Sequence, residues 1–288
     1  MRTTFDFSAA SVADLARADV ARALAEDVGP GDLTAGLVDP ARQAQARIVA
    51  REAAVICGAP WAEAAWRQVD PGVSVRWLVP EGERSRPDQT VVELQGSARG
   101  LLTSERTALN FLQLLSAVAT RTASHVDAVK GTRARIVDTR KTIPGLRLAQ
   151  KYAVRVGGGL NHRIGLFDAV LIKENHIAAA GGVTAALQAA GRVSAGAEFV
   201  EIEVETLAQL DEALEAGARM VLLDNMDLPT LHEAVELNRG RAVLEISGGV
   251  TLESVRTLAE TGVDRISIGS LTKDVKAVDF SMRLQEVS

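Results

Sequence analysis

Residues 138–173 read DTRKTIPGLRLAQKYAVRVGGGLNHRIGLFDAVLIK and carry seven lysines and arginines against two acidic residues. The whole chain, by contrast, has a formal net charge of -5. Positive charge that gathers against this balance, between glycine turns and β-branched runs, is what a site for a multiply charged anion requires. The stretch therefore predicts an anion-binding site.

The basic residues of this stretch fall into two groups. Arg147, Lys151 and Arg155 recur at helical spacing, which predicts a solvated helix face. The others follow a strand-like run or a run of glycines, where cationic forks suit carboxylate and phosphate better than packing. These candidate binding residues are Arg140 and Lys141, after IVDT, and His162 and Arg163, after Gly157, Gly158 and Gly159.

Length and composition limit the class of protein. A chain of 288 residues suits one large domain or two unequal ones, with an aliphatic core because aromatic residues are only 3%. The single cysteine excludes an internal disulfide and fits a reducing compartment. We find no signal-peptide pattern and no apolar run of about 18 residues. We therefore expect a cytoplasmic protein, with no membrane partner and, given its acidic balance, no nucleic-acid partner.

The first hundred residues alternate short strand-like runs with helical segments. Apolar spacing predicts helices over 11–27 and 61–69. The strand candidates, separated by Gly-Pro or Pro-Gly turns, are QARIVA, AAVICG, VSVRWLV and TVVELQG. Together they predict a small mixed sheet with helices, followed by a long helix over 104–130 that links two domains.

Beyond residue 131 the strand candidates alternate regularly with helices. The strands are RIVDT, AVLIK, FVEIEVE, MVLLD, VLEIS and RISIGS. Thr206 and Gln209 form a capping-box signature, and a later helix is expected to begin near Thr251. Buried strands that return through helices imply a parallel sheet with right-handed crossovers. At least six such units favour a closed or nearly closed β/α barrel over an open sheet.

In a β/α barrel the functional residues lie at the carboxyl ends of the strands. Alternation along FVEIEVE places Glu201, Glu203 and Glu205 on one face, where buried carboxylates need cations or a metal. Asp224 ends MVLLD, so Glu203 and Asp224 form a candidate magnesium pair. The alternative, which stays open, is that both carboxylates brace lysines such as Lys173, which ends AVLIK.

The last two units contain the glycine turns SGGVTLESV and ISIGS, where barrels usually bind phosphate. Phosphate donors, a magnesium pair and a cluster of cations would suit a phosphorylated sugar or nucleotide that is joined to a small polyanion. Catalysis would then depend on positioning and charge stabilisation. The candidate phosphate residues are Ser247, Gly248, Gly249 and Gly269.

These motifs together resemble the quinolinate phosphoribosyltransferase family. The matching segments are EDVGPGDLT, LLTSERTALNFLQLLS, the stretch from Asp138 through KENHI, VEIEVE, VLLDN, ISGGV and ISIGSLT. The resemblance implies an incomplete β/α barrel with a smaller N-terminal α/β sandwich domain. We expect the division to be 1–115 and 116–271, with the tail 272–288 returning to the first domain. It also implies a homodimer in which the N-terminal domain of one subunit covers the barrel mouth of the other.

The family reaction joins quinolinate to phosphoribosyl pyrophosphate in the presence of Mg²⁺, as a step of de novo NAD synthesis. Its products are nicotinate mononucleotide, pyrophosphate and carbon dioxide. The resemblance implies that the quinolinate carboxylates are held by Arg140, His162 and Arg163, with Arg106 from the neighbouring subunit. It implies catalytic and substrate-binding roles at the phosphoribosyl and metal site for Lys141, Lys173, Glu203 and Asp224. The 5′-phosphate would lie against Ser247, Gly248, Gly249 and Gly269.

Three other functions remain open on the sequence. Lys173 ends an apolar strand, as the nucleophile of a Schiff-base aldolase does. The chain could also be a phosphometabolite-binding protein without turnover. Among related enzymes, transferases acting on nicotinate or on other substrates are the nearest alternative. Quinolinate is favoured because its second carboxylate accounts for the number of cations.

Overall fold

The computed structural model describes residues 5–285 of the chain. These residues form two compact units. The first, called the parallel unit here, contains residues 124–142 and 159–273. The second, the antiparallel unit, contains 5–123, 143–158 and the described residues from 274 onward. The cation-rich stretch therefore contributes to both units.

The antiparallel unit contains a four-stranded sheet with the order β12-β1-β5-β3. Every pairing in it is antiparallel, so the prediction of a mixed sheet was wrong. Two short strands, β2 and β4, pair separately from this sheet. The strands are β1 (Gln43–Ala50), β2 (Ala54–Val55), β3 (Ser74–Trp77), β4 (Arg84–Ser85), β5 (Gln89–Ser97) and β12 (Phe280–Gln285).

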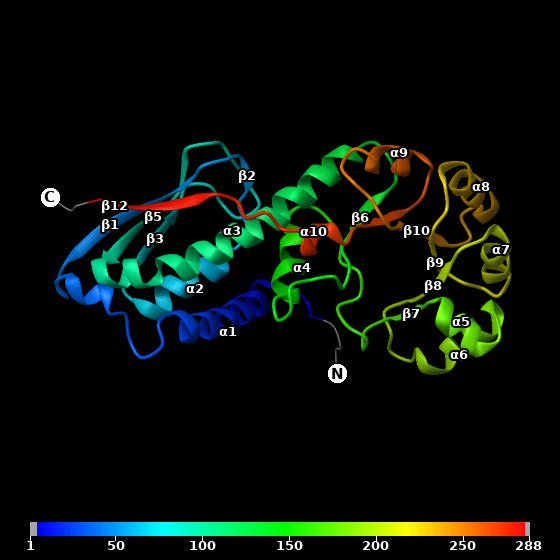
Figure 1. Cartoon of the computed structure of the whole chain (residues 1–288), viewed down its shortest axis with the longest axis horizontal. Helices are drawn as coiled ribbons and strands as arrows, with labels where there is room; N and C mark the ends of the chain where they lie inside the picture. The colour runs from blue at the N-terminus through cyan, green and yellow to red at the C-terminus, as the bar shows by residue number, and fades with distance from the viewer. Residues whose placement is uncertain (1–4, 286–288) are drawn as a thin grey trace. The chain divides into compact units, whose positions relative to one another are not determined.

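Strand β12 comes from the far end of the chain and closes one side of this sheet. It runs beside β1, with Gln45 opposite Gln285 and Ala50 opposite Phe280, and Figure 1 shows the two strands together in blue and red. Phe280 is buried in the same hydrophobic cluster as Ile48. The sheet therefore needs residues from both ends of the sequence.

The helices of the antiparallel unit supply most of its core. Ser8 caps α1 by accepting a hydrogen bond from the Ser11 N–H, which is why this helix begins before the predicted start at 11. Trp61 and Trp66 are fully buried, and the Trp61 indole donates to Asp19 at 2.9 Å. The helical segments are α1 (Ala9–Asp27), the 3₁₀ turn η1 (Thr34–Leu37), α2 (Ala59–Val69), α3 (Ala98–Ala128) and α4 (Arg147–Val156).

The prediction that α4 presents a solvated row of cations was wrong at Lys151. Arg155 is exposed and Arg147 half-buried, but Lys151 is fully buried. Ala149 and Ala153 on the same helix belong to the hydrophobic cluster, so the helix is covered on more than one side. Periodicity placed the three cations on one helix stripe but could not show which part of that stripe is covered.

The parallel unit confirms all six predicted strands. They form one parallel sheet with the order β6-β11-β10-β9-β8-β7. The strands are β6 (Arg135–Val137), β7 (Val170–Ile172), β8 (Val200–Val204), β9 (Met220–Leu223), β10 (Val243–Ser247) and β11 (Arg265–Ser267). The helices are α5 (Glu174–Ala180), α6 (Val183–Val193), α7 (Leu207–Glu215), α8 (Leu228–Asn238), α9 (Val255–Glu260) and α10 (Ser270–Lys273).

The strand order is that of a barrel that does not close. From β7 to β11 each strand pairs with the next one in sequence, and the last of them pairs with the first strand of the unit, β6. The described strands β6 and β7 do not pair with each other, and only an isolated bridge joins Val137 to Leu160 on the open side of β6. The fold is therefore the expected incomplete β/α barrel, open where the cation-rich stretch passes.

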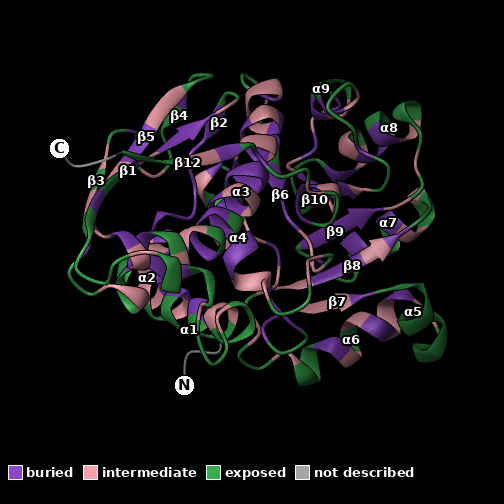
Figure 2. Cartoon of the chain, turned by 60° about the vertical axis from the view of Figure 1, so that its left-hand side comes forward, coloured by how far each residue is buried: buried purple, intermediate pink, exposed green. Residues whose placement is uncertain are grey.

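The two faces of this parallel sheet differ in chemistry. One face packs Ile202, Val221 and Ile246 against helix residues such as Leu210 and Leu231. Figure 2 shows these strands largely buried and exposed residues on the helices around them. The residues that alternate with them in the strands include Glu201, Glu203, Glu245, Ser247 and Ser267. The inner face therefore carries these polar side chains beside Leu171 and Leu222. Glu205 lies past the end of β8 and is exposed.

One helix of the parallel unit starts later than predicted. Thr206 caps α7 as expected, accepting from the Gln209 N–H at 3.1 Å. Thr251, however, lies in a turn in which its hydroxyl accepts from the Ser254 N–H, and α9 begins only at Val255.

Among the described residues, no helix is both long and apolar enough to cross a bilayer.

The tightest helix contact generates a stability prediction. Gly157 follows α4, and a Cβ atom there would lie 2.5 Å from the Ala119 carbonyl oxygen and 2.7 Å from Thr122 Cβ. Since its φ is -73°, a substitution adds steric overlap without backbone strain. We expect Gly157→Ala to lower the free energy of unfolding by about 1 to 3 kcal/mol in urea denaturation.

A matched control is Gly191→Ala in α6, where an added Cβ meets nothing within 4 Å. This change should raise the free energy of unfolding by up to about 1 kcal/mol, since alanine favours helix. If both alanine variants shifted stability in the same direction, the packing described at Gly157 would be wrong.

Candidate active site

A pocket of about 480 Å³ opens at the carboxyl ends of the parallel strands. It brings together most of the residues that the sequence singled out. The predicted residues that line it are Arg140, Lys141, His162, Arg163, Lys173, Glu203, Asp224, Ser247 and Gly248. The pocket has cations on its walls together with two candidate metal ligands, as the strand-end residues predicted.

Lys141 is held by its own backbone. Its N–H donates to Thr139 Oγ1 at 3.0 Å, and its carbonyl oxygen accepts from the Thr272 hydroxyl at 2.7 Å. A Cβ atom at residue 269 would lie 2.8 Å from Lys141 Cδ. Gly269, which is not among the lining residues, therefore leaves room for the Lys141 side chain.

The loop that carries His162 and Arg163 is fixed by the two acidic residues of the opening stretch. Buried Asp138 accepts the His162 N–H at 2.8 Å. Buried Asp168 accepts the N–H groups of Ile164 at 2.6 Å and Gly165 at 2.9 Å. Charge-assisted hydrogen bonds from main-chain N–H groups to these two carboxylates fix the loop that carries His162 and Arg163.

Arg163 is in a strained electrostatic environment. Burial lowers the pKa of its guanidinium, and the neighbouring Arg140 cation lowers it further, while Asp168 and Glu201 oppose the change. Two guanidinium groups that repel each other in a half-buried pocket are stabilised when an anion lies between them. The pair is thus suited to a ligand with more than one negative charge.

The acidic wall of the pocket contains Glu203 and Asp224. Glu203 Oε2 lies 3.1 Å from Lys173 Nζ, so the bracing role left open by the sequence is present for this carboxylate. Asp224 accepts from the Asn225 side chain at 3.2 Å. Both carboxylates line one cavity, and Mg²⁺ commonly takes one or two carboxylates together with substrate oxygens. The pair fits a magnesium site.

The glycine turn after β10 supplies another part of the pocket. Gly248 and Gly249 have φ values of 95° and 59°, a left-handed conformation that glycine adopts without strain. Ser247 and Gly248 line the cavity, but Gly249 does not. The short helix α9 begins at Val255, not near Thr251. The prediction that a helix N-terminus at Thr251 helps to bind the anion was therefore wrong.

Arg106, like Gly249 and Gly269, is a predicted site residue that does not line this pocket. It lies on α3 in the antiparallel unit, is exposed, and is not among the lining residues. Its role in a shared site stays a prediction.

Several lining residues were missed by the sequence reasoning. They are Thr139, Leu171, Leu222, Glu245 and Ser267. The period of two along a strand could have found four of them. Leu171, Leu222, Glu245 and Ser267 each lie two residues before a predicted strand-end residue. The buried run VLEIS was interpreted as core instead.

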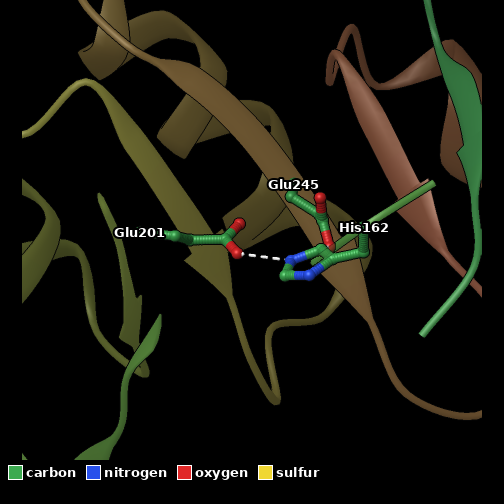
Figure 3. Close-up of side chains that lie close together, drawn as sticks. All are labelled: His162, Glu201 and Glu245. Atoms are coloured by element: carbon green, nitrogen blue, oxygen red, sulfur yellow. Dashed lines mark hydrogen bonds and ion pairs between the residues drawn. The ribbon is translucent and has the colours of Figure 1, made fainter. Parts of the chain in front are cut away.

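Two glutamates, Glu201 on β8 and Glu245 on β10, are buried, and Glu245 lines the pocket. Burial is the main cause that raises the pKa of Glu201 to about 7 and that of Glu245 to about 7. Glu201 also raises the pKa of Glu245, while Arg265 lowers it. Arg265 Nε lies 3.3 Å from Glu245 Oε2, without hydrogen-bond geometry. Figure 3 shows Glu201 and Glu245 on either side of His162, with ligand atoms of all three within 4.8 Å.

The raised pKa of Glu245 makes stability depend on pH. Between about pH 4.5 and 7 the folded protein keeps a proton on Glu245 that the unfolded chain releases. The free energy of unfolding therefore falls as pH rises through this range. Glu245→Gln cannot titrate. Relative to the wild type, this variant should gain about 1 to 3 kcal/mol of unfolding free energy between pH 5 and 8.

Urea denaturation at the two pH values measures this difference. Glu236→Gln, on the exposed face of α8, controls for the introduction of a glutamine. If the free energies of unfolding of the wild type and of Glu245→Gln differed by the same amount at both pH values, that result would contradict the protonated state of Glu245.

The fold and this pocket define a β/α-barrel protein that binds multiply charged anions. Comparison with protein families then places it: residues 32–116 match the N-terminal domain, and residues 118–283 the C-terminal domain, of quinolinate phosphoribosyl transferase. The chain belongs to this family.

Individual relatives agree over nearly the full length. The chain is 45% identical over 278 residues to the nicotinate-nucleotide pyrophosphorylase [carboxylating] of Mycobacterium leprae, covering 94% of this chain and 98% of that protein. It is 40% identical over 257 residues to the probable enzyme of the same name from Bacillus subtilis, covering 89% of each. The solved nicotinate-nucleotide pyrophosphorylase from Francisella tularensis superposes with a TM-score of 0.92 at 43% identity, covering 95% of this chain and 97% of that one.

Proposed function

We propose that this chain transfers the phosphoribosyl group of phosphoribosyl pyrophosphate to quinolinate with decarboxylation, in de novo NAD synthesis. It is a nicotinate-nucleotide pyrophosphorylase (carboxylating), a phosphoribosyltransferase whose products are nicotinate mononucleotide, pyrophosphate and carbon dioxide. The observation that carries the proposal is one pocket lined by Arg140 and Arg163, whose charges interact, together with Glu203 and Asp224. A ligand with two adjacent carboxylates accounts for two guanidinium groups brought close enough to repel each other.

The cationic wall would bind quinolinate. Arg140 and Arg163 would each pair with carboxylate oxygens, since the guanidinium fork matches a carboxylate in bidentate geometry. His162 would contact the same end of the substrate. The loop fixed by Asp138 and Asp168 would keep these groups in place before the substrate arrives, which reduces the entropy lost on binding.

The opposite wall would bind phosphoribosyl pyrophosphate. Glu203 and Asp224 would hold Mg²⁺ and the ribose side. When bound, Mg²⁺ supplies charge neutralisation at the pyrophosphate oxygens. Lys141 and Lys173 would stabilise the charge that develops on the departing pyrophosphate. The 5′-phosphate would lie against Ser247, Gly248 and Gly249, while Gly269 keeps the path of Lys141 open.

The chemistry then follows from positioning and charge. The quinolinate ring nitrogen attacks the ribose carbon while the bond between that carbon and pyrophosphate breaks. The transition state is oxocarbenium-like. The ring nitrogen becomes positively charged, and this charge stabilises the electron pair left on the ring carbon when carbon dioxide departs. That carbon then takes up a proton. Decarboxylation therefore needs a cationic ring more than a protein base.

The structure offers little support for the aldolase alternative. The Lys173 ammonium pairs with Glu203, whereas a Schiff-base lysine reacts as a neutral amine. That alternative would also leave Arg140, Arg163 and Asp224 without a role.

We also propose the assembly and domain organisation that the family resemblance implies. The chain would act as a homodimer in the cytoplasm, in which exposed Arg106 completes the quinolinate site of the neighbouring subunit. The domain division would be 1–115 and 116–271, with the tail 272–288 returning to the first domain; residues 1–4 and 286–288 lie outside the described residues.

The proposed reaction predicts a defined set of products. With phosphoribosyl pyrophosphate and Mg²⁺, the purified protein should convert quinolinate to mononucleotide with one carbon dioxide released per nucleotide formed. Nicotinate in a parallel assay should give no comparable turnover. Turnover of nicotinate without carbon dioxide would keep the phosphoribosyl site but contradict the substrate, and no turnover of either would contradict the proposed function.

The carboxylate clamp predicts the effect of a single substitution. Arg140→Ala should lower kcat/KM for quinolinate at least about 100-fold, because a bidentate charged contact is lost. Exposed Arg192→Ala at the end of α6 serves as a control for loss of a surface cation. Near-normal kcat/KM in the Arg140 variant would remove this residue from the site.

A further inference from the structure

Both ring nitrogens of His162 have defined partners. Nε2 lies 2.7 Å from Glu201 Oε2, and Nδ1 accepts the main-chain N–H of Arg163 at 2.8 Å. The imidazole also meets the Phe199 ring edge to face, with centroids 5.2 Å apart. His162 and Glu201 are buried, at 8% and 0% exposure. The ring is therefore held in one orientation by groups from its own loop and from β8 (Figure 3).

These contacts determine the tautomer. A main-chain N–H always donates, so Nδ1 must offer a lone pair and cannot carry a proton. A neutral imidazole then carries its proton on Nε2, which donates to Glu201. An imidazolium would place two donors, the Arg163 N–H and a protonated Nδ1, against each other. The hydrogen bond at Nδ1 therefore favours a neutral ring, even though Nε2 also lies 3.8 Å from Glu245 Oε1.

The same logic excludes a metal as the purpose of this cluster. His162, Glu201 and Glu245 bring possible ligand atoms within 4.8 Å of one another. A cation at Nε2 would need the lone pair of that nitrogen, while Nδ1 would have to carry the proton. The Arg163 N–H occupies Nδ1, and Arg265 already lies against Glu245.

We propose that Glu201 is a positioning residue for quinolinate recognition, which holds His162 as the neutral Nε2–H imidazole and thereby fixes the loop that presents Arg163. This inference rests on the proposed function for its substrate. The chain of contacts runs from β8 through Glu201 to the His162 ring, and from the ring to the Arg163 main chain. His162 then contributes shape and hydrogen bonding to the site, and the guanidinium groups contribute the charge.

The tautomer can be observed directly. Two-bond ¹H–¹⁵N correlation spectra distinguish the two neutral imidazole tautomers and the imidazolium, and the chain has four histidines to resolve. A His162→Gln variant identifies the His162 signals. In neutral buffer the wild type should show His162 as the Nε2–H form only. Detection of the Nδ1–H form or of imidazolium in the wild type would overturn the proposal.

Substitutions at Glu201 test the positioning role. Glu201→Gln offers an amide oxygen that can accept the same proton, so it should keep the tautomer and stay within about threefold of wild-type KM for quinolinate. Glu201→Leu removes the acceptor and leaves a buried donor unpaired. We expect the His162 signals to broaden or to show a second form, and KM for quinolinate to rise about tenfold. KM for phosphoribosyl pyrophosphate should change by less than about twofold.

Exposed Glu205→Leu, just past the end of the same strand, is the matched control and should change neither the spectra nor KM. If Glu201→Leu left both the His162 signals and KM for quinolinate unchanged while remaining folded by circular dichroism, the proposal would be overturned. Should that variant fail to fold, the wild-type tautomer and Glu201→Gln still decide. The spectra do not depend on turnover, so an inactive protein with the predicted tautomer would contradict the proposed function alone.

Discussion

Burial of acidic groups inside the incomplete barrel is the constraint that organises the parallel unit. Glu201 and Glu245 are fully buried, and carboxyl groups in that environment need hydrogen bonds, cations or protons. His162 and Arg265 satisfy part of this need, and burial raises the pKa of Glu245, which favours its protonated form. The interior is therefore a polar network, which can hold a charged substrate, instead of a filled aliphatic core.

Stability must then come from elsewhere in the chain. The outer face of the parallel sheet packs aliphatic residues such as Ile202 and Val221 against its helices. The antiparallel unit has its own core around Trp61 and Trp66, and β12 adds residues from the end of the sequence. These contacts can offset the unfavourable approach of Arg140 and Arg163, which relaxes when an anion binds. Relief of this repulsion adds to the binding free energy of the anion, while the rest of the fold stabilises the site before binding.

The sequence predicts much of this arrangement, and its failures have physical causes. The six parallel strands and the strand-end cations follow from periodicity, because both depend on local alternation. Lys151 was misjudged, since helical spacing does not show which stripe is covered. Glu245 was missed inside an apolar run, and the loop-fixing roles of Asp138 and Asp168 depend on contacts that only the fold brings together. The quinolinate ring itself came from the family resemblance, because charges alone indicate only a polyanion.

We infer that the pocket is built for a dianion, and equilibrium binding tests this inference most directly. Calorimetric titration should give quinolinate an affinity at least about tenfold higher than nicotinate, since one additional charged hydrogen-bonding contact contributes about 1.5 to 3 kcal/mol. In Arg163→Gln that preference should largely disappear. Equal affinities in the wild type, or a preference that survives in the variant, would contradict the account of Arg140 and Arg163 as a dicarboxylate clamp.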